Sequence, residues 1–287
     1  MEPSLLQILF LGLVQGAAEL LPVSSSAHVI VAEKLMGLDP SSPSMTFLLV
    51  MLHTGTMFAV ILYFWKAWLN TFFVSGESFK TTVRNVGLAT LITLVVGFAL
   101  KFLIEKILLH GSTHDEMEDL FGHLPLVGSA ILAAGLIIVT AGLLRGRRDG
   151  HAEINASSSF WIGAAQGLCL PFRGLSRSGT TISAGMLLGI GRRRVEEFSF
   201  ALAVVITPPA IAKELLRLLK SREETASPQY LLHLLGPGFL GMAGAFVAGL
   251  LALRLLSNWL EKGHWAWFGY YCVAFSGFVF FLASRGY

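Results

Sequence analysis

Charged residues are scarce in this sequence of 287 amino acids. Asp, Glu, Lys and Arg together make up 14% of it, whereas hydrophobic residues make up 54% and the mean hydropathy is +0.68. A soluble domain of ordinary composition carries about a quarter charged residues. The shortage of charge excludes an ordinary soluble protein and, together with long apolar runs, predicts an all-α polytopic membrane protein.

Several functional signatures are missing as well. The chain has two cysteines, Cys169 and Cys272, both in apolar runs and without a CxxC pattern, which excludes a disulfide framework. Basic residues do not gather in a patch interleaved with aromatic residues, so we expect no nucleic-acid partner. No P-loop, GxSxG or HExxH pattern occurs, which removes the commonest hydrolase and nucleotide-binding signatures.

Long apolar runs define the membrane topology. About 20 residues are needed for a helix to span the hydrocarbon core. Six runs meet this requirement, at about 46–65, 87–109, 124–144, 198–219, 234–256 and 265–283. We expect one transmembrane helix from each run.

Two further pairs of apolar runs are too short to span. The first pair covers about 4–21 and 28–37 and is interrupted by "PVSSSAH" after Leu21; the second covers about 158–170 and 179–190 and is interrupted by "PFRGLSRSG" after Leu170. In lipid, backbone polar groups need partners, so a break at membrane depth must be covered by protein or line a wet cavity. We interpret the pairs as two broken, re-entrant helical hairpins.

The two hairpins resemble each other. When Ser24 is superposed on Ser176, "SSSAHVIVAEKLMG" lies over "SRSGTTISAGMLLG" with several identical positions, which indicates an internal duplication. Three full spans follow each hairpin, so the second copy is expected to be inverted relative to the first. This predicts a single membrane domain over 1–287, with repeat 1 at about 1–144 and repeat 2 at about 150–287, and two breaks that meet near the midplane.

Charge outside the spans indicates an orientation. The arginines of "RGRR" (145–148) and "RRR" (192–194) flank the second hairpin and favour that side as cytoplasmic. The acidic segment "HGSTHDEMEDLFGH" (110–123) and both termini would then face outward.

The second break combines a guanidinium with hydroxyls and glycines directly before a helix. Arg177 offers a planar fork of donors that suits phosphate oxygens, and the helix starting near Gly179 adds free N–H groups and a positive dipole end. The candidate phosphate-binding residues of this segment are Gly174, Ser176, Arg177, Ser178 and Thr181. The structural alternative is a cytoplasmic turn in which Arg177 snorkels and a serine caps the helix.

The first break supplies an acid–base set. Gln15 and Glu19 are four residues apart and share a helix face. Glu19 can act as a general base or bind a divalent cation, with Gln15 as a weaker ligand, and His28 can move a proton near neutral pH. Alternatively, Glu19 pairs with Arg177 only to stabilise the fold, and His28 is a hydrogen-bonded packing residue.

The serines of the first break leave the nucleophile open. Ser24 and Ser26 are candidates for binding phosphate oxygens. Ser25 is three residues from His28, so its hydroxyl can attack phosphorus while His28 or Glu19 takes the proton. Attack by His28 and attack by water are the other two routes, and Ser25 is the favoured one.

Two further candidates rank lower. His53 lies in the middle of a span, where its ring must face the bundle interior, and bridging between helices is favoured over contact with a ligand. The acidic loop offers His110, His114, Asp115, Glu116, Glu118 and Asp119. Their spacing matches no familiar metal-ligand pattern, so we expect a solvated connection.

These motifs resemble those of a known family, the membrane-integral undecaprenyl-diphosphate phosphatases of the bacitracin-resistance type. The family's Glu-or-Gln followed four residues later by Glu matches Gln15 and Glu19, and its Pro-Val-Ser-Ser segment with a histidine matches 22–25 and His28. Its Gly-x-Ser-Arg-Ser-x-x-Thr segment matches 174–181. The resemblance covers nearly the whole chain.

The resemblance implies an activity and a location. The expected reaction is hydrolysis of a C55 polyprenyl diphosphate to its monophosphate at the outer face of the bacterial plasma (inner) membrane, which recycles the lipid carrier of cell-wall synthesis. A divalent cation, Mg²⁺ or Ca²⁺, is expected to assist, bound together with the diphosphate. The implied partner is the lipid diphosphate within the bilayer, and a homodimer is left open.

The sequence also departs from the family pattern. Gln15 is the less acidic option, which leaves one carboxylate in the first break. "PFRG" places Arg173 where the family usually has proline, so Arg173 either adds a phosphate contact or lengthens the turn. The main rival function is a transporter of a lipid phosphate or small anion, because inverted repeats with broken helices are also transporter architecture.

Overall fold

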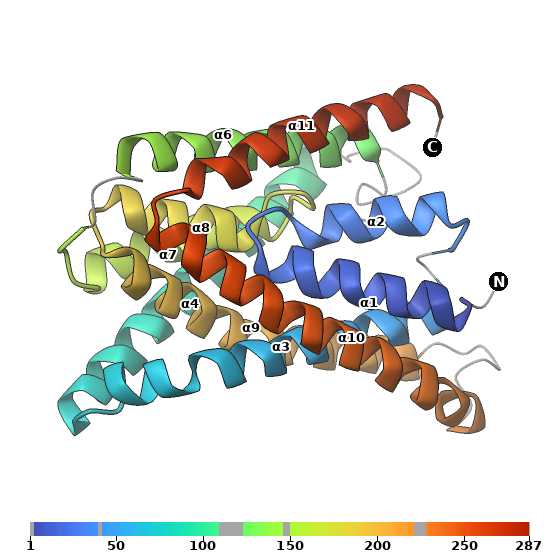
Figure 1. Ribbon diagram of the computed structural model, residues 1–287, viewed down its shortest axis with the longest axis horizontal. Coiled ribbons are helices and arrows are strands. Elements are labelled where there is room, and N and C mark those ends of the chain that lie inside the picture. Colours follow the sequence, from blue (N-terminus) through green and yellow to red (C-terminus); the bar gives the residue numbers. More distant parts are fainter. Residues whose placement is uncertain (1–2, 40–41, 109–122, 146–149, 221–227, 287) are drawn as a thin grey trace.

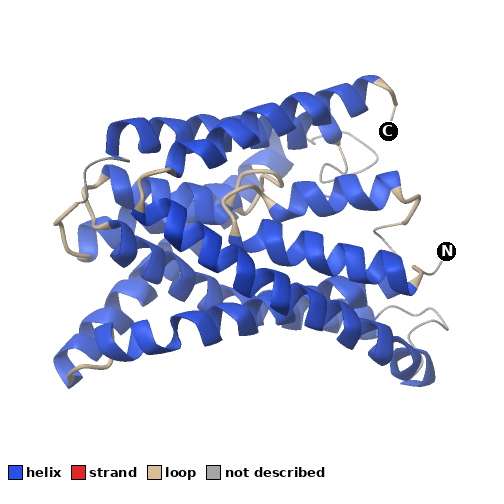
Figure 2. Cartoon of the chain, viewed as in Figure 1, coloured by secondary structure: helices blue, strands red, loops and turns tan. Residues whose placement is uncertain are grey.

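The computed structural model describes residues 3–39, 42–108, 123–145, 150–220 and 228–286. Within these ranges the chain is built of helices, with no strand and one isolated β-bridge between Ala152 and Ile190 (Figure 2). The predicted all-α fold is confirmed. The acidic residues at 110–119 and residues 146–149 of the basic segment lie outside the described ranges.

Six helices of the described chain are long and apolar enough to cross a membrane. They are α3 (Pro43–Thr71), α4 (Gly76–Leu108), α6 (Leu124–Arg145), α9 (Arg192–Lys220), α10 (Pro228–Glu261) and α11 (Trp265–Ser284). Each one coincides with an expected span, so the prediction of a six-span protein is confirmed.

Four short helices form the two broken hairpins. They are α1 (Leu5–Leu20), α2 (Ser25–Leu35), α7 (Ala156–Cys169) and α8 (Arg177–Leu187). The longest has 16 residues, which at about 1.5 Å per residue falls short of a hydrocarbon core of about 30 Å. Both hairpins therefore end inside the protein.

Local sequence explains where the hairpin helices begin. Ser4 forms a capping box with Gln7 before α1, and Asn155 forms one with Ser158 before α7. These reciprocal bonds satisfy N–H groups that have no partner within the helix. Between α1 and α2, Pro22 has no N–H to continue a helix.

The hairpins enter the bundle from opposite ends, and their turns meet in its middle (Figure 1). The helix α1 packs against α10, and α7 packs against α4. Glycines allow this close approach: a Cβ on Gly16 would lie 2.4 Å from the Ala245 carbonyl oxygen, and one on Gly163 would lie 2.4 Å from the Ala89 carbonyl oxygen. Because α1 lies close against α10 and α7 lies close against α4, both breaks are held inside the bundle.

The long helices form the frame around the breaks. The helix α3 packs against α9 and α10, and α6 packs against α11. The inverted relation between the halves and the repeat boundaries stay predictions.

Candidate active site

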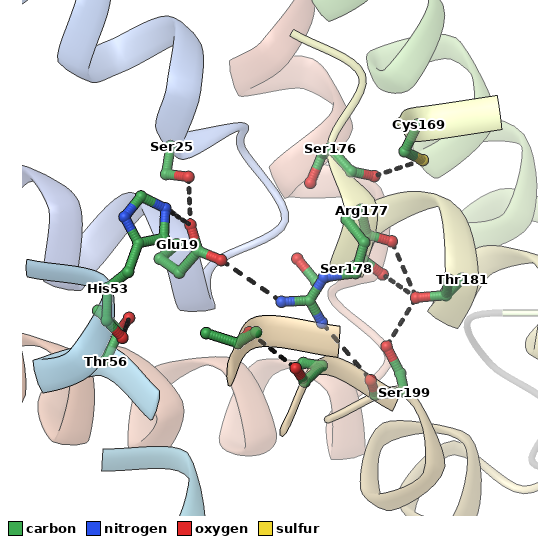
Figure 3. Close-up of polar contacts among 12 residues, drawn as sticks. Glu19, Ser25, His53, Thr56, Cys169, Ser176, Arg177, Ser178, Thr181 and Ser199 are labelled. Carbon is green, nitrogen blue, oxygen red and sulfur yellow. Dashed lines mark hydrogen bonds and ion pairs between the residues drawn. The ribbon is translucent and has the colours of Figure 1, made fainter. Parts of the chain in front are cut away.

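A pocket of about 220 Å³ lies where the two breaks meet. The predicted site residues that line it are Glu19, Ser24, Ser25, Ser26, Ser176, Arg177 and Ser178. Figure 3 shows Glu19 and Ser25 facing Arg177 across the site. The structure thus brings together side chains from the two breaks, with Glu19 and Arg177 separated by 158 residues in the sequence.

Glu19 is the centre of the polar contacts on the α1 side. It lies in the last turn of α1, and its Oε2 accepts hydrogen bonds from the Ser25 hydroxyl and from Gln15 Nε2, the latter at 3.2 Å. A hydroxyl that donates to a carboxylate is the arrangement of a nucleophile and its base. Gln15 itself is buried behind Glu19, at 1% exposure.

Arg177 is the first residue of α8 and reaches back to the first break. Its Nη2 lies 3.5 Å from Glu19 Oε1, its Nη1 donates to the Ser199 carbonyl at 3.5 Å, and its guanidinium lies 5.9 Å from the centre of the Phe200 ring. The side chains of Arg177 and Glu19 are 20% and 19% exposed. Partial burial lowers the local dielectric and strengthens the effect of this cation on an anion in the pocket.

Hydroxyl groups of the second break surround the guanidinium. The Ser176 hydroxyl caps α8 by accepting from the Gly179 N–H at 3.2 Å, and Ser178 donates to the Leu21 carbonyl at 3.5 Å, which ties the two breaks together. Both serines line the pocket. The start of α8 also offers N–H groups of the kind that bind phosphate oxygens.

Two predicted phosphate-binding residues lie behind the pocket wall. Thr181 is fully buried, and its hydroxyl contacts the Arg177 carbonyl at 2.8 Å and Ser199 Oγ at 2.6 Å. Gly174 has φ +111°, and a Cβ there would lie 2.6 Å from the Val127 carbonyl oxygen. In the structure, Gly174 shapes the turn and Thr181 supports Arg177.

His28 is not among the residues that line the pocket. Its Nδ1 lies 2.8 Å from the Ser24 carbonyl oxygen, its Nε2 lies 2.7 Å from the Tyr271 hydroxyl, and its ring stacks on Phe275 with centres 3.9 Å apart. Of the first-break residues predicted to carry chemistry, the structure brings Glu19 and Ser25 into the pocket and turns His28 away from it.

His53 takes a position beside Glu19. Its Nε2 lies 3.9 Å from Glu19 Oε2, its Nδ1 lies 2.8 Å from the Leu49 carbonyl oxygen, and it lines the pocket (Figure 3). The sequence signal for His53 was a polar ring in the middle of a span. The sequence does not show which face of α3 meets α1, so it does not place His53 beside Glu19.

Comparison with known proteins identifies the family. Residues 8–278 match the family described as "Bacitracin resistance protein BacA". The chain belongs to this family. The sequence resemblance that the two breaks carry is thereby confirmed.

Curated relatives of this BacA-family chain are similar over their whole length. One from Acinetobacter baylyi, named "Undecaprenyl-diphosphatase 2", is 54% identical over 281 residues, which cover 97% of this chain and 98% of the relative. Relatives named "Undecaprenyl-diphosphatase" from Desulfosudis oleivorans and Bacteroides fragilis are 33% and 32% identical, and the matches cover 99% and 97% of this chain. With six candidate spans, this chain is a multi-pass bacterial membrane protein.

The BacA-family pocket contains few metal ligands of its own. Within the described ranges, no group of three or more His, Cys, Asp or Glu side chains is placed to hold a metal ion. The carboxylate of Glu19 lines the pocket, and the amide of Gln15 lies behind it, hydrogen-bonded to that carboxylate. Mg²⁺ is commonly bound by one or two carboxylates together with substrate phosphates, and this donor set fits such shared binding.

Arg173 is the departure from the family pattern that reaches the pocket. It lies in the turn between α7 and α8 and lines the pocket together with Arg177. A second arginine therefore lines the same pocket. Of the two sequence interpretations, the structure allows a phosphate contact as well as a longer turn.

Proposed function

We propose that this protein hydrolyses undecaprenyl diphosphate to undecaprenyl phosphate and inorganic phosphate. The observation that carries the proposal is the meeting of Glu19 and Ser25 with Arg177 in one pocket, because a base, a hydroxyl and a guanidinium are the groups that phosphoryl transfer needs. The names of the family relatives support the same reaction. This activity belongs to bacterial cell-wall synthesis and fits the family's link to bacitracin resistance.

The diphosphate is proposed to bind on the α8 side of the pocket. Arg177 provides a charged fork, Ser176 and Ser178 provide hydroxyls, and the first turn of α8 provides backbone N–H groups. Ser24 and Ser26 face the same pocket from the first break. The apolar tail would lie against the lipid-facing helix surfaces.

Ser25 is proposed as the nucleophile and Glu19 as its base. The Ser25 oxygen attacks the terminal phosphorus, its proton passes to the Glu19 carboxylate, and the P–O bond to undecaprenyl phosphate breaks. Water then attacks the phosphoserine, which returns Ser25 and releases phosphate. Arg177 stabilises the negative charge on the transferring group, which is the protein's main contribution in such reactions.

A divalent cation, Mg²⁺ or Ca²⁺, is proposed to bind together with the diphosphate. Glu19 would be its protein ligand, with the Gln15 amide as a weaker one. When bound, the cation would neutralise part of the diphosphate charge. The proposed orientation has the pocket open to the outer side of the membrane. It rests on the arginines at the end of α6 and the start of α9, and these two helix ends lie on the side of the bundle away from the termini (Figure 1). Nothing in the described residues supports a homodimer, and the proposal does not require one.

The test is timed release of phosphate from C55 diphosphate by the purified protein in detergent. The matched control is the Arg177→Ala variant, prepared in parallel. The proposal expects continuous release by the parent and release near background by the variant. Binding of the lipid without release of phosphate would contradict the proposal and favour a transporter.

A further inference from the structure

The first break contains a backbone conformation that needs support. Ser24 has φ +71° and ψ 93°, and within the described ranges it is the one residue other than glycine with positive φ. A side-chain-bearing residue adopts such a conformation only when its surroundings hold it there. The equivalent position of the second break, Ser176, has φ −57° and caps its helix with its own hydroxyl, whereas Ser24 makes no side-chain cap.

The support for Ser24 comes from His28. The Ser24 carbonyl oxygen can only accept hydrogen bonds, so the His28 nitrogen 2.8 Å away, Nδ1, carries a proton and donates it. The same carbonyl accepts the His28 backbone N–H at 3.3 Å. Two donors from one residue therefore fix the peptide group that joins Ser24 to Ser25.

The other side of the His28 ring is held by α11. The Tyr271 hydroxyl lies 2.7 Å from His28 Nε2, and Phe275 stacks on the ring with an angle of 9° between the planes. The next residue, Cys272, donates from its sulfur to the Pro22 carbonyl at 3.5 Å. Two consecutive residues of α11 thus contact the first break, 243 and 250 residues away in sequence.

These contacts leave His28 without a nitrogen for chemistry in the pocket. Nδ1 is committed to the Ser24 carbonyl and Nε2 to Tyr271, and the ring does not line the pocket. The Ser25 hydroxyl already has an acceptor in Glu19. Acceptance of the Ser25 proton by His28, or attack by His28 on phosphorus, would require the hydrogen bond of the reacting nitrogen to break and the ring to turn toward the pocket.

We propose that His28 and Tyr271 are positioning residues: the chain Tyr271–His28–Ser24 carbonyl holds the left-handed Ser24 backbone and thereby aims the Ser25 hydroxyl at Glu19. This inference rests on the proposed function, because it assigns roles within the same phosphatase site. In this assignment, Ser25 and Glu19 do the chemistry, and His28 orients them.

The test compares His28→Asn with His28→Ala. The asparagine amide nitrogen takes about the place of Nδ1 and can donate to the Ser24 carbonyl, but it is neither a base nor a nucleophile. We expect His28→Asn to keep kcat within about fivefold of the parent, the scale of one neutral hydrogen bond, with an unchanged pH–rate profile. His28→Ala is expected to lower kcat much further while KM stays close to that of the parent.

A second pair of variants tests the α11 end. Tyr271→Phe removes one hydroxyl and is expected to lower kcat a few-fold with KM unchanged. Tyr270→Phe is the matched control, since Tyr270 is adjacent, about equally exposed and packed against Trp267. It should behave as the parent does.

The results of these assays distinguish failure of the proposed function from failure of the positioning role. If the parent releases no phosphate, the proposed function fails before this inference is reached. Loss of a general base lowers kcat by about 10²–10⁴-fold. If the parent is active and His28→Asn loses this much, His28 acts chemically and the inference is overturned. Tyr271→Phe that matches Tyr270→Phe in kcat would also overturn it, because the α11 link would then do nothing.

Discussion

Replacement of Arg177 by lysine tests whether the guanidinium acts as a fork or as a point charge. In the structure, the two terminal nitrogens of Arg177 serve different partners, Glu19 at 3.5 Å and the Ser199 carbonyl at 3.5 Å. A lysine ammonium keeps the charge but cannot reproduce this planar, two-pronged geometry. We therefore expect Arg177→Lys to fail nearly as badly as Arg177→Ala.

The magnitude follows from the two hydrogen bonds that a guanidinium fork can donate to the transferring phosphoryl group. Loss of two charge-assisted hydrogen bonds at about 1.5–3 kcal/mol each gives about 3–6 kcal/mol, which is roughly a 10²–10⁴-fold loss of rate. Complete removal of a charge-stabilising arginine in phosphoryl transfer costs about 10³–10⁵-fold. The two ranges overlap, so both variants should lie far below the parent.

The assay is phosphate release from C55 diphosphate at saturating lipid, with equal elution from a sizing column as the check on folding. Arg173→Ala is the comparison, because Arg173 also lines the pocket but lies outside the Ser-Arg-Ser turn. We expect that variant to stay within about tenfold of the parent, a smaller loss than one charged hydrogen bond at about 1.5–3 kcal/mol would cause. If Arg173→Ala abolished release while Arg177→Lys kept most of it, the assignment of the phosphate-binding arginine would be reversed.

Further predictions concern the carboxylate, the cation and the helix contacts. Glu19→Gln should lose about 10²–10⁴-fold in kcat while still binding the lipid diphosphate. Gln15→Glu should stay active. Equal rates for Glu19→Gln and the parent would remove Glu19 from the mechanism. Chelation with EDTA should stop phosphate release and added Mg²⁺ or Ca²⁺ should restore it, and full activity in excess chelator would refute the cation proposal. Gly16→Ala should destabilise the protein by about 1–3 kcal/mol, because its Cβ would lie 2.4 Å from the Ala245 carbonyl oxygen, whereas Gly87→Ala meets nothing within 4 Å. Thermal unfolding in detergent compares these two, and equal midpoints would contradict the close packing of α1 on α10.

Much of the fold could be predicted from the sequence, because the length of an apolar run and the polar residues that interrupt it are local features. Each of the six expected spans coincides with an observed helix, and the polar interruptions coincide with the ends of α1 and α7. The meeting of Glu19 with Arg177 could also be predicted, since irregular backbone inside a membrane protein must be covered by something polar.

The orientation of individual side chains could not be predicted in the same way. Whether His28 faces the pocket depends on Tyr271, which is 243 residues away and contacts it through a tertiary packing that no local pattern encodes. His53 faces Glu19 because of how α3 lies against α1, and Thr181 faces Ser199 because of how α8 lies against α9. In each case the residue type was recognisable, but the partner was set by the rotation of one helix against another.

The central claim is that Ser25, with Glu19 as its base and Arg177 as its cation, attacks the terminal phosphorus of the lipid diphosphate. The most direct measurement is rapid acid quench of a turnover mixture containing substrate labelled at the terminal phosphate, followed by peptide mapping. We expect labelled phosphate on Ser25 in the parent, and a Ser25→Ala variant that carries no label and has lost nearly all activity. Steady release of phosphate with no label on Ser25, or a Ser25→Ala variant that keeps about a tenth or more of the parent rate, on the order of 1.4 kcal/mol in barrier, would contradict the account and assign the attack to water or to another group.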